Sequence, residues 1–388
     1  MRPIYLDTAA ATPLDHAVKR VISEAEQKYW ANPASLHKGG VAAAAALRAA
    51  RASVGESLGA HPDEIIFTSG GTEANNLAVL GAPAGEVIVS AIEHSSILAP
   101  AATRSALILP VDEHGHIKLA ELKKLLSPAT SLVSIIYAHN EIGVIQDIKA
   151  ISKIIRAHRA EFKTAFPYLH IDACQAPRFL NVDVRQLGVD LMTINASKIY
   201  GPKGVGALFI KRGVKLKPRA LGGGQEGDYR AGTENVPGIM GLAAALKLAL
   251  KQQEKETKKL TPLRDEVIKT ILKTIPDTVL NGDTRERLPN NLNFSFAGVL
   301  GEQVVLELAA LGIAASTGSA CAIPKHDDSY VILALGKSKS VAKSAVRFTL
   351  GRDTTKADLN YLIKSLKNII TKLRTANHAY AANLTLWV

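Results

Sequence analysis

The amino-acid sequence predicts an α/β protein, with a large domain built on a mainly parallel sheet and a smaller α+β domain towards the C-terminus. Up to about residue 240, short apolar runs rich in β-branched residues alternate with stretches of helical spacing, a pattern typical of parallel strands joined by helices. A long charged helical stretch then ends the alternation. The chain has 388 residues, 47% of them hydrophobic, so it exceeds the usual size of one domain and has ample apolar residues for two.

Individual elements follow from the same patterns. Six apolar runs predict strands of the large domain, at residues 64–70, 85–94, 131–141, 168–175, 190–198 and 204–211. Residues 144–162 between two of these strands have the spacing of a covering helix. In the C-terminal part, the predicted strands are 288–298 and 344–355, and the predicted helices are 241–275, 301–312 and 356–376.

Composition and charge exclude several classes of protein. The net charge of +12 comes from 47 Lys and Arg against 35 Asp and Glu, with basic runs at 211–219 and 251–259. We interpret these runs as solvated faces rather than a nucleic-acid site, because no nucleic-acid motif accompanies them. The most apolar stretches, such as 41–47, are too short to cross a bilayer. Asp7 interrupts the apolar N-terminus, so we expect no signal peptide, no membrane partner and a cytoplasmic protein.

The two cysteines, Cys174 and Cys321, must be interpreted singly. Two residues cannot form a disulfide framework or a cysteine-rich zinc site, and we expect no metal to be required. Cys174 lies between two polar residues of a strand end and is predicted to be a structural thiol. Cys321 lies in 316–328, a stretch of small and polar residues with loop composition.

Polar residues at the predicted strand ends indicate a binding site, because ligands of open α/β sheets bind beyond the carboxyl ends of the strands. After the strand at 64–70, Gly71 and Thr72 begin a helix, whose N-terminal N–H groups suit a phosphate. An ordinary capped helix is the alternative for that motif on its own. Single residues at other strand ends are equally ambiguous; they are His94, Asn140, Asp172, Gln175 and Lys198.

Together these residue types match the needs of pyridoxal 5'-phosphate. A phosphate requires a cluster of N–H donors, and an aromatic ring requires a face to stack on. The pyridine nitrogen requires a carboxylate such as Asp172, because the cofactor acts as an electron sink when that nitrogen is protonated. The aldehyde requires an amine, and burial against the sheet would make Lys198 nucleophilic.

At this point the chain resembles the cysteine desulfurases of the class V aminotransferase family, which have PLP-dependent fold type I with a seven-stranded, mainly parallel sheet. The length of the loop after Cys321 is similar to that of the group I branch. The similarity covers nearly the whole chain. Its motifs are "YLDTAAATP" (5–13), "NPASLH" (32–37), "TSGGTEANN" (68–76), "HNEIGVIQDI" (139–148), "HIDACQA" (170–176), "KIYGPKGVGAL" (198–208), "RAGTEN" (230–235), "LPNNLNFSF" (288–296), "STGSAC" (316–321), "SYVILALG" (329–336) and "VRFTLGR" (346–352).

The resemblance implies a role for each matching residue. Lys198 would bind the cofactor as a Schiff base, His94 would stack on its ring, and Asp172 would hold the pyridine nitrogen. Gln175 would contact the ring hydroxyl, and Asn140 would lie near the cofactor. The phosphate would be held by Gly71, Thr72 and, from the second subunit of a homodimer, Thr233. Asn32 and Arg347 would bind the carboxylate of the substrate.

The resemblance also implies the reaction and the domains. L-cysteine would be converted to L-alanine, with Lys198 taking the Cα proton and Cys321 accepting the sulfur as a persulfide for iron–sulfur cluster assembly or tRNA thiolation. An exposed loop of small residues suits a thiol that must meet both substrate and an acceptor protein. Cys321 could also transiently ligate an iron–sulfur cluster. We expect a large domain at 15–255 and a small domain formed by 1–14 and 256–388.

The chain departs from the family pattern in two places. The family's Ser-x-His-Lys is replaced by "NASK", with Asn195 and Ser197 as changed residues that can still hydrogen-bond a phosphate. This change puts tight cofactor binding in question. After Cys321 stands "AIPKHDD". Lys325 and His326 in this stretch are hypothesised either to lower the pKa of the thiol or to serve a particular sulfur acceptor.

Two other functions remain open. One is a related enzyme of the same fold, such as a selenocysteine lyase or another class V enzyme; an aminotransferase is disfavoured because it needs no acceptor thiol. The other is a non-catalytic scaffold that retains the fold, for which the altered "NASK" stretch is the only support.

Overall fold

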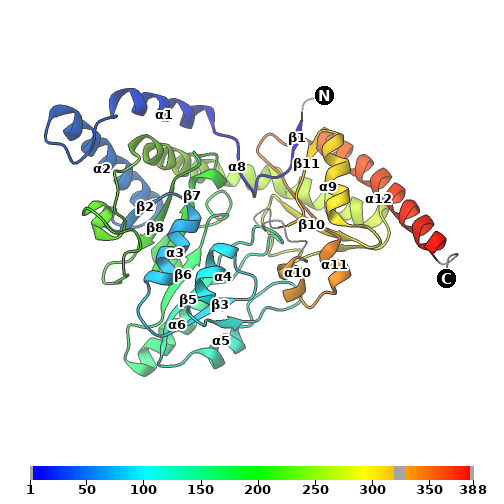
Figure 1. Ribbon diagram of the computed structural model, residues 1–388, viewed down its shortest axis with the longest axis horizontal. Coiled ribbons are helices and arrows are strands. Elements are labelled where there is room, and N and C mark those ends of the chain that lie inside the picture. Colours follow the sequence, from blue (N-terminus) through cyan, green and yellow to red (C-terminus); the bar gives the residue numbers. More distant parts are fainter. Residues whose placement is uncertain (1–2, 319–327, 385–388) are drawn as a thin grey trace.

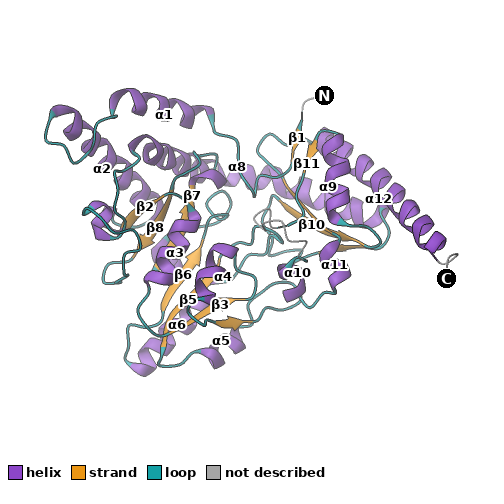
Figure 2. Ribbon diagram, in the orientation of Figure 1, coloured by secondary structure: helices purple, strands orange, loops and turns teal. Residues whose placement is uncertain are grey.

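The computed structural model describes residues 3–318 and 328–384 and has two lobes joined by one long helix (Figure 1). The larger lobe holds a seven-stranded sheet, and the smaller holds a three-stranded sheet with helices against it (Figure 2). The predicted α/β class and the mainly parallel central sheet are confirmed.

The seven-stranded sheet has the order β2-β8-β7-β6-β5-β3-β4, and its parallel ladders join β7, β6, β5, β3 and β4. The strand β8 runs antiparallel to both of its neighbours, β2 and β7. The strand bounds are β2 Ile65–Thr68, β3 Glu86–Ser90, β4 Leu107–Leu109, β5 Thr130–Ile136, β6 Tyr168–Asp172, β7 Leu191–Asn195 and β8 Gly206–Ile210. Most of these strands are buried along their whole length, as expected for a sheet covered on both faces.

Helices cover both faces of this sheet, and alternate strand residues divide between them. In β2, Ile65 and Phe67 belong to a core cluster with residues of α2 and α6, whereas Ile66 belongs to a separate cluster with residues of α3 and α4. The helices of this lobe are α1 His16–Lys28, α2 Lys38–Leu58, α3 Gly71–Gly81, α4 Ser95–Ala102, α5 Leu119–Leu125, α6 Ile148–Phe162 and α7 Val184–Leu187.

The smaller lobe contains the antiparallel sheet β12-β10-β9 and the short parallel pair β1-β11. Its strands are β1 Ile4–Tyr5, β9 Thr278–Leu280, β10 Asn291–Phe296, β11 Ile313–Ala314 and β12 Ala345–Thr349. Its helices are α9 Gly301–Ala310, α10 Tyr330–Ala334, α11 Lys339–Lys343 and α12 Lys356–Leu384. Because β1 pairs with β11, the N-terminal segment belongs to this lobe.

The helix α8 (Val236–Thr274) connects the two lobes. Its first half, to Ala249, packs in the core of the large sheet, and its second half, from Leu260, packs in the core of the small one. We therefore propose that the domain boundary lies inside α8, between residues 255 and 256, where the family resemblance places it. None of the helices within the described ranges combines the length and apolar character needed to cross a bilayer.

Candidate active site

A cavity of about 330 Å³ lies beyond the carboxyl ends of β5, β6 and β7. That volume is in the range of small-molecule sites. It receives side chains from the large lobe and one arginine from β12. Its lining residues are Ala9, Ala10, Gly71, Thr72, Asn75, His94, Ser96, Ile136, Ala138, Asn140, Asp172, Cys174, Gln175, Asn195, Lys198 and Arg347. Most residues predicted from strand ends therefore meet in one place.

The last residue of β6, Asp172, lies in this cavity with only 5% of its surface exposed. Asn75 Nδ2 donates to one carboxylate oxygen at 2.8 Å, and the backbone N–H of Cys174 donates to the other at 3.0 Å. Charge-assisted hydrogen bonds of this kind stabilise a buried carboxylate. Asp172 is thus suited to hold a cationic ring nitrogen.

The position of Lys198 follows from the turn after β7 and from the N-terminal segment. The 3₁₀ turn Ala196–Lys198 turns the chain sharply, and Lys198 Nζ donates to the carbonyl of Ala10. The backbone N–H and hydroxyl of Ser197 both donate to Asn195 Oδ1 at 3.2 Å. The two residues that depart from the family pattern therefore bond each other and brace the turn that carries the lysine.

The predicted phosphate site lies where α3 begins. Gly70 has a φ of 153°, which favours glycine. A Cβ on Gly71 would lie 2.8 Å from Cys174 Sγ, so only glycine fits without movement. The first N–H groups of a helix have no acceptor within it, and this arrangement offers them to an anion.

His94 precedes α4 and caps it. Its Nδ1 accepts the backbone N–H of Ser96 at 3.1 Å and lies 2.8 Å from Ser96 Oγ. Burial lowers the pKa of His94 below its usual range, Lys198 lowers it further, and Asp172 opposes the shift. His94 therefore offers a neutral ring to the cavity.

Arg347 enters the cavity from β12 and is only 1% exposed. Its Nη2 pairs with Asp7 Oδ1 at 2.7 Å, and its Nη1 donates to the carbonyl of Gly318 at 2.7 Å. Its Nε is buried without a hydrogen-bond partner within the described part of the chain. A guanidinium here suits a carboxylate ligand.

Three predicted residues that the structure describes do not line this cavity, namely Asn32, Thr233 and Ser197. Asn32 is exposed, and its side chain accepts the backbone N–H of Ala34 at 2.9 Å. Thr233 is also exposed in the single chain. Cys321, like Lys325 and His326 after it, lies outside the described residues.

Several residues of the site were not predicted. Asn75 and Ser96 line the cavity from α3 and α4, and neither lies at a strand end where the sequence directs attention. The carbonyls of Ala9 and Ala10 bind Gln175 and Lys198, and backbone atoms leave no compositional signal. Cys174 also lines the cavity, and burial raises the pKa of its thiol well above the usual range.

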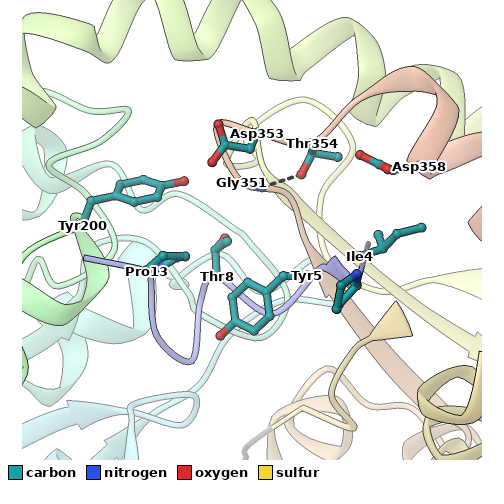
Figure 3. A pocket seen from close by; sticks show the side chains of 10 residues that line it. Ile4, Tyr5, Thr8, Pro13, Tyr200, Gly351, Asp353, Thr354 and Asp358 are labelled. Atoms are coloured by element: carbon teal, nitrogen blue, oxygen red, sulfur yellow. Dashed lines mark hydrogen bonds between the residues drawn. The ribbon is translucent and has the colours of Figure 1, made fainter. Parts of the chain in front are cut away.

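A separate cavity of about 210 Å³ lies between the N-terminal segment and the start of α12 (Figure 3). Tyr200 forms part of its wall, and Gly351 N donates to Thr354 Oγ1 at 2.8 Å beside it. It contains neither Lys198 nor Asp172, so it is not the reactive site. No group of three or more metal-ligating side chains occurs among the residues that the structure describes.

The fold and the site together define a pyridoxal phosphate enzyme of fold type I. The residues present fit this cofactor. Gly71 and Thr72 at the start of α3 line the same cavity as the buried carboxylate of Asp172 and the amine of Lys198, so an N-terminal anion site, a carboxylate and an amine face one space.

Comparison with known proteins gives the family. The model of the aminotransferase class-V family matches residues 4–362. The cysteine desulfurase IscS of Dictyoglomus turgidum is 44% identical, with 96% of each chain covered. Cysteine desulfurase IscS 1 of Archaeoglobus fulgidus is 39% identical over 97% of this chain and 99% of that protein. A solved NifS-like protein shares 31% identity and a TM-score of 0.87, with 95% of this chain and 99% of that chain covered. The chain belongs to the cysteine desulfurases of the aminotransferase class-V family, which depend on pyridoxal phosphate.

The cradle at Gly71 gives a testable prediction. Gly71→Ala should weaken pyridoxal phosphate binding about tenfold, because overpacking against Cys174 costs roughly 1–3 kcal/mol. Removing the opposing sulfur in Gly71→Ala/Cys174→Ala should restore most of the affinity. Titration of the apoprotein with the cofactor, followed by absorbance, measures both. An equal loss in the single and double variants would contradict the packing account.

Proposed function

We propose that the protein converts L-cysteine to L-alanine and transfers the sulfur to Cys321 as a persulfide. The observation that carries this proposal is the convergence of Lys198, Asp172 and Arg347 in one buried cavity. The carbonyl of Gly318, three residues before Cys321 in sequence, is bound by the same Arg347 that lines this cavity. The relatives' names support a cysteine desulfurase.

Six of the cavity residues are each proposed to have one task toward the cofactor. Gly71 and Thr72 would hold the phosphate, Asp172 would hold the pyridine nitrogen, and His94 would contact the ring. Gln175 and Asn140, which line the same cavity, would contact the ring hydroxyl and lie near the cofactor, respectively. When bound, pyridoxal phosphate supplies an electron sink for bond cleavage at the substrate.

The substrate is proposed to bind through its carboxylate. Arg347 is already fixed by Asp7 and Gly318, so it is pre-organised for a carboxylate and loses little freedom on binding. Asn32 is the second proposed ligand of that carboxylate. Lys198, held by the N-terminal segment, is the base that takes the proton from the substrate Cα.

The sulfur step balances without an external oxidant. The Cys321 thiolate attacks the sulfur of the substrate, a sulfur–sulfur bond forms, and the bond between that sulfur and the substrate Cβ breaks. The carbon retains the electron pair and is protonated, which yields L-alanine. Cys321 then carries the persulfide that an acceptor protein reduces or receives.

Acceptor and location are part of the proposal. Iron–sulfur cluster assembly or tRNA thiolation is the proposed destination of the sulfur, through a scaffold or acceptor protein. We place the protein in the cytoplasm and propose that it binds neither membrane nor nucleic acid directly.

Two alternative functions would give different results when Cys321 is replaced. A selenocysteine lyase or another class V enzyme of this fold would not need the acceptor thiol in the same way. A scaffold would retain the fold and produce no alanine. The Ser197–Asn195 contact favours the enzyme over the scaffold, because the altered "NASK" stretch still braces the lysine turn.

Cysteine replacement tests the proposal. Cys321→Ala should abolish alanine release from L-cysteine in the presence of reductant, because no thiolate remains to take the sulfur. Cys174→Ala is the matched control and should retain turnover, because burial keeps that thiol protonated. Chromatographic measurement of alanine decides. Turnover that survives in Cys321→Ala favours the lyase, and absent turnover in wild-type protein favours the scaffold.

A homodimer is proposed because Thr233 is assigned to the partner's site. Ala220 and Arg230 form a parallel β-bridge, which places Leu221 beside the segment that leads to Thr233. The side chain of Leu221 is 83% exposed in the single chain. An exposed leucine beside a predicted shared site is suited to an interface.

Leu221→Glu should therefore shift the protein towards monomer, because a charge would be buried at the interface. Leu306→Glu is the control, since Leu306 is also exposed but lies on α9 of the small lobe. Sedimentation equilibrium gives both masses. A monomeric wild type, or equal dimerisation of Leu221→Glu and wild type, would contradict this assignment.

A further inference from the structure

A chain of buried hydrogen bonds joins Asp172 to His94 through Asn75 and Ser96. Asn75 is 1% exposed and lies on α3, one turn after the glycine cradle. Its Nδ2 lies 2.8 Å from Asp172 Oδ2 and 2.8 Å from Ser96 Oγ. Ser96 Oγ lies 2.8 Å from His94 Nδ1. Neither Asn75 nor Ser96 has a role in the function proposed above.

The chemistry of these groups fixes the direction of each hydrogen bond. A carboxylate only accepts, so Asn75 must present its NH₂ group to Asp172. The second hydrogen of that group then points to Ser96 Oγ, which must accept it. Because the hydroxyl of Ser96 accepts there, its own hydrogen is available to His94 Nδ1 at 2.8 Å.

Two donors therefore converge on one nitrogen of His94. The backbone N–H of Ser96 is a donor in every protonation state, and it lies 3.1 Å from Nδ1. A proton on Nδ1 would face both donors and is excluded by this geometry. The neutral ring that remains carries its proton on Nε2.

We propose that Asn75 and Ser96 are positioning residues whose hydrogen bonds keep the ring proton of His94 on Nε2. This inference rests on the roles proposed above for His94 and Asp172. Asn75 therefore has two effects. It donates a hydrogen bond to the carboxylate of Asp172, and through Ser96 it determines which ring nitrogen of His94 carries the proton. An uncharged ring avoids placing a second positive charge against a protonated pyridine nitrogen.

Other titratable groups also face His94. Asp172 on β6 favours a protonated ring, whereas Lys198 after β7 disfavours it. His139, which follows β5, is also close enough to interact electrostatically. Burial lowers the pKa of His139 to about 4, and the hydrogen bond between its Nε2 and the carbonyl of Ile92, at 2.7 Å, opposes this shift. Its Nδ1 accepts two backbone N–H groups. His139 is neutral at physiological pH and adds no charge.

The test is a nitrogen NMR titration of His94 in holoenzyme labelled with ¹⁵N-histidine, with the His94 signals assigned by their loss in His94→Gln. Long-range ¹H–¹⁵N spectra show which ring nitrogen carries the proton. Wild type should show a protonated Nε2 and a bare Nδ1 at neutral pH. A proton on Nδ1 would overturn the inference.

Variants test the connection through Ser96. Asn75→Ala should raise the midpoint of the His94 titration by about half to one pH unit, because the freed Ser96 hydroxyl can turn and accept from a protonated Nδ1. Ser96→Ala should raise it similarly, and Ser96→Thr should restore it. In the Ser96→Ala background, Asn75→Ala should add no further shift. An equal shift in both backgrounds would show that Asn75 acts through packing and would overturn the proposed chain.

Asn76→Ala is the matched control. Asn76 is the next residue and also contacts Ser96, but it donates to the backbone carbonyl at 3.3 Å rather than to the hydroxyl. Its removal should leave the His94 titration unchanged, and a shift equal to that of Asn75→Ala would contradict the inference. Alanine release by the same wild-type preparation tests the proposed desulfurase activity separately. The position of the His94 proton is measured without reference to turnover, so either proposal can fail while the other holds.

Discussion

The buried carboxylate of Asp172 is the charge around which the rest of the site is arranged. A carboxylate with 5% exposure is unfavourable unless donors surround it, and the chain supplies them from two elements: Asn75 on α3 and the backbone that follows β6. Because Asn75 lies on α3, its hydrogen bond to Asp172 holds α3 against the end of β6. Once α3 is there, the glycine turn at its start and the amine of Lys198 face one cavity.

A second constraint joins the two lobes at that cavity. Arg347 comes from the small sheet, yet its guanidinium is buried against Asp7 of the N-terminal segment and the carbonyl of Gly318. The N-terminal segment in turn offers the carbonyls of Ala9 and Ala10 to Gln175 and Lys198. The N-terminal segment therefore contacts Gln175 and Lys198 of the large lobe as well as Arg347 of the small sheet.

The sequence predicted those features that depend on strand periodicity and on residue type at strand ends. The strand that ends at Asp172 and the turn that carries Lys198 are found where the apolar runs predicted them. The edge strand β4 was not predicted, because three residues with an exposed Ile108 carry little periodic signal. Asn75 was missed for a different reason: its role depends on the packing of α3 against β6, which is a tertiary contact without local signature.

The assignments of Asn32, Thr233 and Cys321 stay predictions from the family resemblance. Asn32 and Thr233 are exposed in the single chain, and Cys321 lies outside the described residues. The measurement that tests the central claim most directly is the position of the cofactor bond. Borohydride reduction of the holoenzyme, followed by proteolysis and mass spectrometry, identifies the lysine that carries pyridoxal phosphate. The account predicts the label on the peptide that contains Lys198, and a label on another lysine, or on none, would contradict it.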